Sequence, residues 1–245
     1  MERNCGVDFL QTHRYCHPET LRIMKRIAMI PLVLAFAAQA YAQQWTVLFN
    51  GKNTDKFWAY GQKTFPSDIW VIDGDALKTT PGKSVDIITK DKYKDFELEF
   101  EWKVSPGANS GVMYRVAESE TEPAWHTGPE MQILDDAKHA DGKTPKTTAG
   151  SLYALIAPND QKKLKPVGEF NSAKITMKNN HVEHWLNGAK VLEYEWGSPE
   201  VKALIAKSKF APMPKFMAES SGHIVFQHHG DQVWFRNIRV RKLTG

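Results

Sequence analysis

Cysteine is nearly absent from this sequence of 245 residues, and the two cysteines, Cys5 and Cys16, both lie near its start. The chain from residue 43 onward has none. This absence excludes a disulfide framework, a thiolate nucleophile and a zinc-thiolate site from that part of the chain. We therefore expect stability to come from an ordinary hydrophobic core, which a chain of about 200 residues can form as a single domain.

Long hydrophobic runs are also scarce. The most apolar run, residues 27–38, is shorter than the roughly 20 residues that a membrane-spanning helix needs, so we expect no membrane span. Two basic residues precede this run, and an Ala-Tyr-Ala tripeptide ends just before Gln43, which is the pattern of a secretory signal peptide with its cleavage site. We expect that translation starts at Met24 and that residues 1–42 are an upstream segment plus a signal peptide. Residues 43–245 are then one exported domain, periplasmic or secreted.

Neither sign of charge is in large excess. Without residues 1–42 the chain has 203 residues and a formal net charge of +2, and it contains no arginine-rich stripe. Nucleic-acid-binding proteins typically carry such a stripe or a strongly basic patch. We therefore expect no nucleic-acid partner.

Short alternating runs of apolar and polar residues, separated by turn residues, make up most of the remaining sequence. In residues 95–104, DFELEFEWKV, the apolar side chains point one way and three glutamates point the other. One helix is expected in residues 198–210, SPEVKALIAKSKF, where Ser198 is the N-cap residue, Pro199 is at the first helical position and the apolar residues have helical spacing. Many short strands and one short helix predict an all-β protein, a jelly-roll β-sandwich of two antiparallel sheets.

Residues 125–136, WHTGPEMQILDD, combine a strand pattern with polar and aromatic side chains. Glu130 and Gln132 lie on one face of the expected strand, and Met131 and Ile133 lie on the other. An ordinary outer strand with one solvated face explains the alternation. The neighbouring tryptophan, histidines and aspartates favour a second interpretation, in which the strand is a wall of a sugar-binding cleft.

Six segments carry a resemblance to a known family: LFNGKNTDKFW, EFEWKVSPGANSGVMYRV, TGPEMQILDDAKHADG, AGSLYALIAP, KPVGEFNSAKITMKNNHVEHWLNG and GHIVFQHHGDQVWFRNIRVRKL. In this order they span residues 45–243 and resemble the 3-keto-disaccharide hydrolase family, long catalogued as a domain of unknown function within the concanavalin A-like lectin and glucanase superfamily. The resemblance implies a jelly roll with a concave sugar-facing sheet, an exported location and activity on glycosides oxidised at carbon 3. The implied partner is a carbohydrate, a 3-keto-glucoside or a related disaccharide.

A ketone at carbon 3 changes how a glycosidic bond can break. An ordinary glycosidase stabilises an oxocarbenium-like transition state with two carboxylates about 5 to 9.5 Å apart. The ketone instead acidifies the hydrogen on carbon 2, so that a base can remove it, the aglycone can leave carbon 1 by elimination, and water can then add. Such a site needs a base, a donor or cation at the enolate oxygen, and an acid for the leaving group.

The candidates for catalysis are Glu130, His126, His184 and His229. Glu130 ranks first, as the base or as the carboxylate that orients His126 or another histidine. His184 has apolar neighbours on its own face of a strand, so a core histidine is the alternative. His229 lies near the end of residues 222–230, which we expect to form a hairpin with residues 231–243.

The candidates for substrate binding are Glu101, Asn109, Arg115, Gln132, Tyr153, Gln227 and Trp58. Residues 95–104 and 111–116 are expected to be antiparallel neighbours. Glu101 and Arg115 then face each other, either as an ion pair on the cleft floor or as an ordinary cross-strand salt bridge. Tyr153 and Trp58 offer a hydroxyl contact and a stacking surface, or are core aromatics.

Asp135 and His139 are weak candidates for a divalent-cation site, because oxygen and imidazole ligands suit such ions. Turn-capping explains the same side chains, so no cofactor is assigned. A second class of function stays open, a non-catalytic, lectin-like carbohydrate-binding module on the same fold. The titratable groups on the expected polar face favour the enzyme, because a pure binding surface does not need them.

Overall fold

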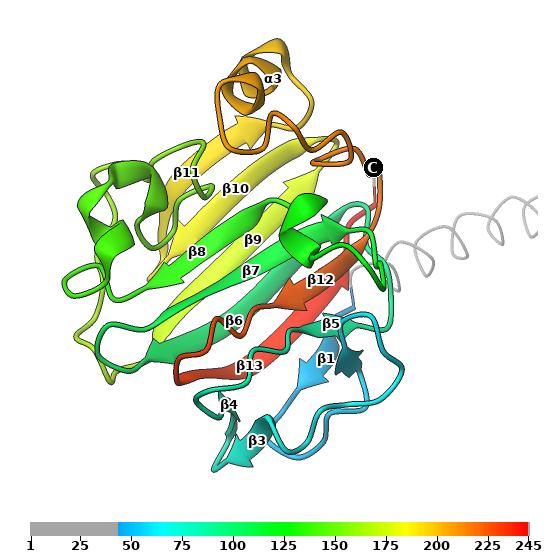
Figure 1. The fold of residues 1–245 in the computed structure, drawn as a ribbon, viewed down its shortest axis with the longest axis vertical. Coiled ribbons are helices and arrows are strands. Elements are labelled where there is room, and N and C mark those ends of the chain that lie inside the picture. The colour runs from blue at the N-terminus through cyan, green and yellow to red at the C-terminus, as the bar shows by residue number, and fades with distance from the viewer. Residues whose placement is uncertain (1–43, 245) are drawn as a thin grey trace, which may run out of the picture. The chain divides into compact units, whose positions relative to one another are not determined.

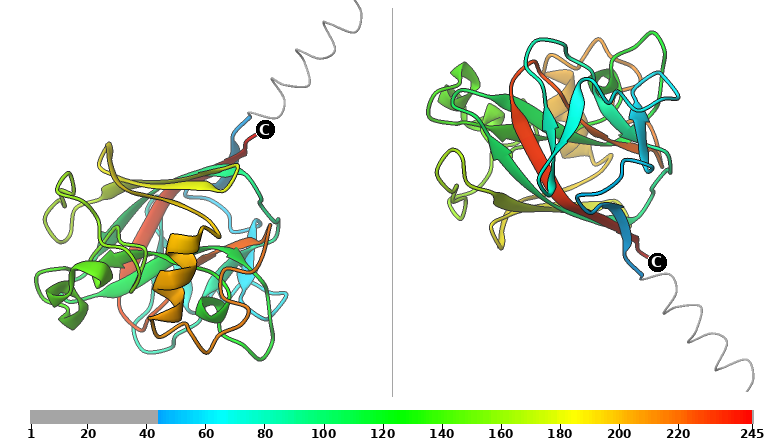
Figure 2. Two further views of the ribbon diagram at one scale, coloured as in Figure 1. Left: turned by 90° about the horizontal axis from the view of Figure 1, so that it is seen from above. Right: turned by 90° about the horizontal axis from the view of Figure 1, so that it is seen from below.

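A computed structural model describes residues 44–244 of the chain, so the expected signal peptide and the expected start at Met24 lie outside the described residues. The described residues form two antiparallel sheets that pack face to face, as Figures 1 and 2 show. The apolar side chains between the sheets make up the core. This arrangement confirms the predicted all-β sandwich of jelly-roll type.

The large sheet has eight strands in the order β11-β10-β9-β6-β13-β4-β3, and β1 also pairs with β13. Its strands are β1 (Thr46–Phe49), β3 (Trp70–Asp73), β4 (Ala76–Thr79), β6 (Phe96–Val104), β9 (Asn171–Lys178), β10 (His181–Leu186), β11 (Ala189–Glu195) and β13 (Val233–Lys242). The small sheet has five strands in the order β2-β5-β12-β7-β8. They are β2 (Phe57–Ala59), β5 (Ile87–Thr89), β7 (Asn109–Val116), β8 (Glu130–Leu134) and β12 (His223–Phe226).

Strand β6 shows how the alternating sequence produces the two layers. Its apolar side chains are buried between the sheets, and its glutamates lie on the outer face of the large sheet. Each glutamate pairs there with an arginine of β13: Glu97 with Arg241, Glu99 with Arg239 and Glu101 with Arg236. These exposed cross-strand pairs each contribute little, so burial of the apolar face is what stabilises the strand.

The predicted helix is present as α3 (Pro199–Ala206). The Ser198 side chain caps it by accepting a hydrogen bond from the backbone N–H of Val201 at 3.2 Å. Three short 3-10 helices also occur: η1 (Ala124–His126), η2 (Ala140–Lys143) and η3 (Pro145–Thr147). No helix in residues 44–244 is long and apolar enough to cross a membrane.

Strand β8 is buried on both faces, which the sequence pattern did not predict. Residues 149–156 run alongside it and exchange backbone hydrogen bonds with it. Gln132 N–H donates to the carbonyl of Ser151, and Tyr153 N–H donates to the carbonyl of Glu130. The polar face of β8 therefore lies in an enclosed setting, with Glu130 only 8% exposed and Gln132 only 1% exposed.

Candidate active site

A row of polar positions crosses the outer face of the small sheet. Gly111 of β7 faces Gln132 of β8 in the strand register, and Gln227 N–H donates to the carbonyl of Gly111 at 2.9 Å. The residues one step along these strands, such as Met131 and Phe226, point into the core, so the row itself points outward. The carboxyl group of Glu130 lies over Gly111, and a Cβ at position 111 would collide with Glu130 Oε1. Glycine at position 111 thus makes room for a carboxyl group at the centre of this face.

A cavity of about 240 Å³ opens over this row. Its lining consists of Asn109, Trp125, Gly128, Glu130, Gln132, Tyr153, Lys209, Phe210, Gln227 and His229. Six of these were candidates from the sequence: Asn109, Glu130, Gln132, Tyr153, Gln227 and His229. Pockets for drug-sized ligands usually measure about 300 to 1,000 Å³, so this cavity suits one ring-sized ligand.

Three amide side chains in the cavity wall contain buried atoms without a hydrogen-bond partner among the described residues. They are Nε2 of Gln132, Oδ1 of Asn109 and Oε1 of Gln227. An unsatisfied buried polar atom costs about 1 to 3 kcal/mol, so such atoms are rare unless a ligand or water completes them. One donor and two acceptors in a single cavity match a ligand that carries both hydroxyl and carbonyl groups.

Two carboxyl groups on this face have raised pKa values. Burial raises the pKa of Glu130 to about 8, with the nearby charge of Lys209 opposing the shift and those of Asp86 and Asp141 adding to it. Burial also raises the pKa of Asp86 to about 6. A hydrogen bond of 2.8 Å from the His228 backbone N–H lowers this pKa and so reduces the shift. Two interacting carboxyl groups with separated pKa values are typical of acid–base sites.

Asp86 belongs to the same face although it does not line the cavity. It precedes Ile87 of β5, whose side chain is in the core, so the Asp86 side chain points outward. Strand β12, with Gln227 just after it, lies between β5 and β7. Neighbouring strands are about 4.8 Å apart, so Asp86 lies on the order of 10 Å from Gly111, where the Glu130 carboxyl group sits.

Tyr153 and Lys209 form another part of the wall. The Tyr153 hydroxyl group donates a hydrogen bond to Oδ2 of Asp141 at 3.2 Å, and burial together with this carboxylate raises the pKa of Tyr153 to about 12. Tyr153 therefore stays protonated at neutral pH. The Lys209 ammonium group lies 4.4 Å from the centre of the Tyr153 ring and 5.2 Å from that of Trp125. Burial lowers the pKa of Lys209, while Glu130 and Asp141 oppose that shift.

The predicted pairing of Glu101 with Arg115 is wrong. Strand β6 belongs to the large sheet and β7 to the small one, so the turn between them crosses from one sheet to the other instead of closing a hairpin. Glu101 pairs with Arg236 at 2.7 Å on the outer face of the large sheet. The Arg115 side chain is buried, donates to the carbonyl of Lys94 at 3.1 Å and does not line the cavity. The predicted hairpin of residues 222–230 with 231–243 fails for the same reason, because β12 and β13 lie in different sheets.

Three further candidates also lie away from the cavity. His184 is in the core, where its Nε2 lies 2.8 Å from the Tyr114 hydroxyl group, and burial lowers its pKa to about 4. It is therefore the core histidine that the sequence left as an alternative. His126 pairs with Glu122 outside the cavity. Trp58 lies elsewhere on the small sheet, with the Lys63 ammonium group 4.1 Å from its ring centre.

Asp135 and His139 have local structural roles. Asp135 accepts hydrogen bonds from the backbone N–H groups of Gly107 at 2.7 Å and Ala137 at 3.1 Å. His139 Nδ1 accepts one from the backbone N–H of Asp141 at 3.1 Å and caps η2. Turn-capping thus accounts for both residues.

One other group within residues 44–244 has the composition of a cation site, formed by His181, Glu183 and Glu193 on the large sheet. Lys190 already bonds both carboxylates, at 3.1 Å and 2.6 Å, so its ammonium group occupies the place that a cation would take.

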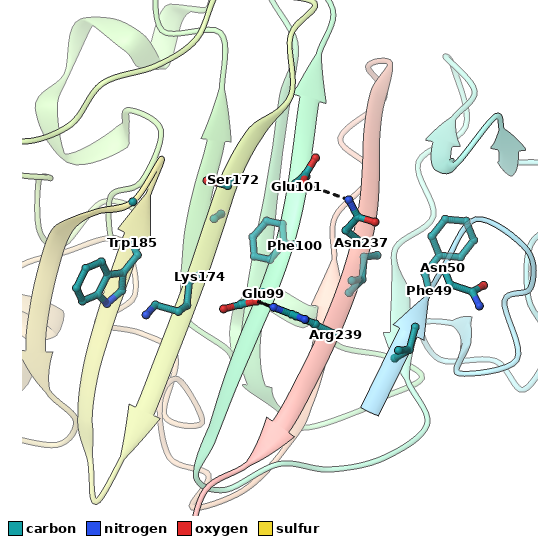
Figure 3. A pocket seen from close by; sticks show the side chains of 14 residues that line it. Phe49, Asn50, Glu99, Phe100, Glu101, Ser172, Lys174, Trp185, Asn237 and Arg239 are labelled. Carbon is teal, nitrogen blue, oxygen red and sulfur yellow. Dashed lines mark hydrogen bonds and ion pairs between the residues drawn. The ribbon is translucent and has the colours of Figure 1, made fainter. Parts of the chain in front are cut away.

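A larger hollow, of about 710 Å³, lies on the outer face of the large sheet (Figure 3). Its acidic groups are already paired: Glu99 with Arg239, and Glu101 with Asn237 at 3.1 Å. The smaller cavity, with its buried carboxyl group and unpartnered amides, is therefore the candidate active site.

Sequence reasoning missed Lys209, Phe210 and Asp86. The sequence pattern placed Lys209 and Phe210 at the end of the expected helix, but the helix ends at Ala206 and both residues lie in the segment after it. Asp86 could have been predicted from the alternation of side chains along a strand, because its neighbour Ile87 begins an apolar run and is buried.

Comparison with known proteins gives the family. Residues 44–241 match the family described as 3-keto-alpha-glucoside-1,2-lyase-like domain. The chain is 35% identical over 232 residues to the 3-keto-disaccharide hydrolase of Bacteroides thetaiotaomicron, and the match covers 82% of this chain and 79% of that protein.

Solved structures agree with this assignment. A protein from Parabacteroides distasonis that has been assigned as a candidate glycosyl hydrolase is similar at 31% identity with a TM-score of 0.75, covering 82% of this chain and 94% of that one. A non-specific endo-beta-1,3(4)-glucanase of family GH16 shares the fold alone, with a TM-score of 0.50 and 8% identity over 82% of this chain and 95% of that one. The chain therefore belongs to the family of 3-keto-alpha-glucoside-1,2-lyase-like domains.

Proposed function

We propose that this protein is a glycosidase-type hydrolase that cleaves 3-keto-glycosides by elimination followed by hydration. Family membership and the similar hydrolases support the general class of reaction. The observation that carries the proposal for this chain is the buried carboxyl group of Glu130 beside unpartnered amides in a cavity of one-ring size.

The first step is removal of the carbon 2 hydrogen by ionised Glu130. The carboxylate takes the proton, the electrons of the C–H bond form the C2–C3 double bond of an enolate, and the C3 oxygen gains the negative charge. Gln132 lies two residues along the same strand face, and its Nε2 is buried without a partner. A donor at that place is suited to the C3 oxygen. With a pKa of about 8, Glu130 is ionised in a minority of molecules at neutral pH, and this ionised fraction is the active base.

The second step is loss of the aglycone. The enolate re-forms the C3 carbonyl, a double bond forms between C1 and C2, and the bond from C1 to the aglycone oxygen breaks. That oxygen needs a proton. Asp86 is the second carboxyl group on this face with a raised pKa, and it lies outside the cavity lining, where the aglycone would extend. Water then adds across the C1–C2 double bond and gives the free 3-keto-sugar, so the net reaction is hydrolysis.

The carboxyl content of the cavity favours elimination over the ordinary glycosidase route. Among the described residues, Glu130 is the one carboxyl group in the cavity lining. The oxocarbenium route typically needs two carboxyl groups that flank the sugar. Elimination needs one base in contact with carbon 2, which this cavity provides.

A non-catalytic sugar-binding module is the competing function. Binding alone does not require a carboxyl group that is buried at the cost of a raised pKa, so the position of Glu130 favours the enzyme.

The test is to incubate the protein with a 3-keto-glucoside and with the same glucoside that has not been oxidised, and to follow both by NMR. We expect release of aglycone from the 3-keto-glucoside only. Binding of the 3-keto-glucoside without release would support the sugar-binding module and contradict the enzyme.

A further inference from the structure

Lys209 lies in a short segment that we call the strap (residues 207–218), of which Lys209 and Phe210 line the cavity. The strap follows α3, and Met217 N–H joins it to the region of η1 through a hydrogen bond of 2.8 Å to the carbonyl of Thr127. Phe210 stacks on Phe216 with ring centres 4.0 Å apart and an angle of 4° between the rings. These contacts hold the backbone that carries Lys209 against the cavity.

Lys209 is an exposed residue, and its ammonium group lies beside three aromatic rings. Its Nζ lies 4.4 Å from the ring centre of Tyr153, 5.2 Å from that of Trp125 and 5.3 Å from that of Phe210. Aromatic faces attract cations without using their N–H groups, so the hydrogens of the ammonium group stay free to donate. Lys209 interacts with Glu130 and Asp141 through space, without a direct hydrogen bond.

The three amide side chains of the cavity carry no charge that could neutralise an anion. The unpartnered atoms of Asn109 and Gln227 are acceptors, which would repel a negative oxygen, and Gln132 offers a neutral donor. Lys209 is the one lysine or arginine among the described residues that line the cavity. Lys209 is therefore the ammonium group available to a developing oxyanion, and His229 is the other nitrogen base in the lining.

We propose that Lys209 is a catalytic residue whose ammonium group contacts the C3 oxygen of the bound sugar and stabilises the enolate. This inference rests on the proposed function, and it also defines a ligand class: planar, pyranose-like rings that carry an ionisable enol next to a ketone. Such compounds share the planar ring of the enolate and, when ionised, carry a negative oxygen on the carbon next to the ketone that matches C3. They should bind more tightly as anions than as neutral molecules.

Kojic acid is a probe with this chemistry. Its six-membered ring contains an oxygen, a hydroxymethyl group beside that oxygen, a ketone, and an enol in the positions that match carbons 3 and 2 of the sugar. The enol ionises in mildly alkaline water, and the enolate absorbs at longer wavelength than the neutral form. The ultraviolet spectrum of the bound probe therefore reports its ionisation independently of turnover.

We expect the wild-type protein to bind kojic acid with an enolate spectrum at a pH where the free probe is neutral. Lys209→Met should weaken binding by about 10-fold or more and lose the enolate spectrum, and it should lower turnover of a 3-keto-glucoside by about 100-fold, the scale of losing one oxyanion partner. Lys209→Arg keeps the positive charge, so it should retain part of the kojic acid binding, the enolate spectrum and the turnover. Lys207→Met, an exposed position in the same strap, is the matched control and should behave as wild type.

An unchanged enolate spectrum and unchanged turnover in folded Lys209→Met would overturn the role of Lys209 and leave the proposed function intact. A wild-type protein that leaves the 3-keto-glucoside uncleaved would instead overturn the proposed function. The two failures are thus separated by the wild-type assay.

Discussion

The enclosed position of Glu130 connects activity and stability at a single residue. An exposed glutamate costs little to replace, but this one is 8% exposed, and burial raises its pKa to about 8. We expect Glu130→Gln to lower turnover of a 3-keto-glucoside by about 100-fold or more, the usual contribution of a general base. Binding of the 3-keto-sugar should survive, because the amide has nearly the same shape as the carboxyl group.

The same substitution should stabilise the protein at neutral pH. The folded pKa of Glu130 lies above its ordinary value of 4.5, so burial favours the neutral form. Stability is therefore fully present below pH 4.5 and is lost as the pH rises toward about 8, since only the unfolded chain ionises in that window. Urea unfolding should show Glu130→Gln to be more stable than wild type by about 3 kcal/mol at pH 7 and equal to it near pH 4. A loss of stability at pH 7 would contradict this account.

Replacement of Asp86 should slow the departure of the aglycone without affecting removal of the carbon 2 hydrogen. Asp86→Asn keeps an acceptor for the His228 N–H but cannot give a proton to the leaving oxygen. Cleavage of a 3-keto-glucoside with an alkyl aglycone should fall by about 100-fold. Cleavage of the 4-nitrophenyl analogue should change little, because nitrophenolate leaves without a proton. Asp91→Asn, an exposed neighbour, is the control. Equal losses with both substrates would show that Asp86 only supports the fold.

Much of the candidate site was predicted from the rule that residues two apart on a strand lie on the same face. Gln132 shares a face with Glu130, and His229 shares one with Gln227, and all four line the cavity. Lys209 was not predictable, because its place depends on how the strap folds over the sheet. The burial of Glu130 was not predictable either, because it lies in a cavity lined by Tyr153 and Phe210, which are distant in the sequence.

At the scale of elements, the sequence indicated the strands but not their division between the sheets. The turns after β6 and β12 look like hairpin turns, yet each carries the chain from one sheet to the other. The alternation of side chains along a strand shows which residues share a face of the sheet. It does not show which of the two sheets the strand belongs to. Glu101 and Arg115 were therefore paired wrongly, although both strands were recognised.

The contact between β7 and β8 at Gly111 gives a test at this scale. Gly111→Ala places a methyl group where Glu130 Oε1 lies, so the carboxyl group must move. We expect turnover to fall by about 10-fold or more, since small displacements of a catalytic group are costly. In a Glu130→Gln background the alanine should cause little further loss of turnover. Independent, additive losses would contradict the coupling of these two positions.

At the scale of the whole molecule, the alternating runs predicted the sandwich because burial of one face of each strand is sufficient to form two layers. Export is a proposal that concerns residues outside the described range. We expect Edman sequencing of the protein purified from its native host to begin at or near Gln43. A folded cytoplasmic product that begins at Met1 would contradict export.

The central claim is that the glycosidic bond breaks after removal of the carbon 2 hydrogen. The most direct measurement compares kcat/KM for a 3-keto-glucoside that carries hydrogen or deuterium at carbon 2. The account predicts slower cleavage of the deuterated substrate, because the C–H bond breaks before the aglycone leaves. Equal rates for the two substrates, together with cleavage of the unoxidised glucoside, would contradict it.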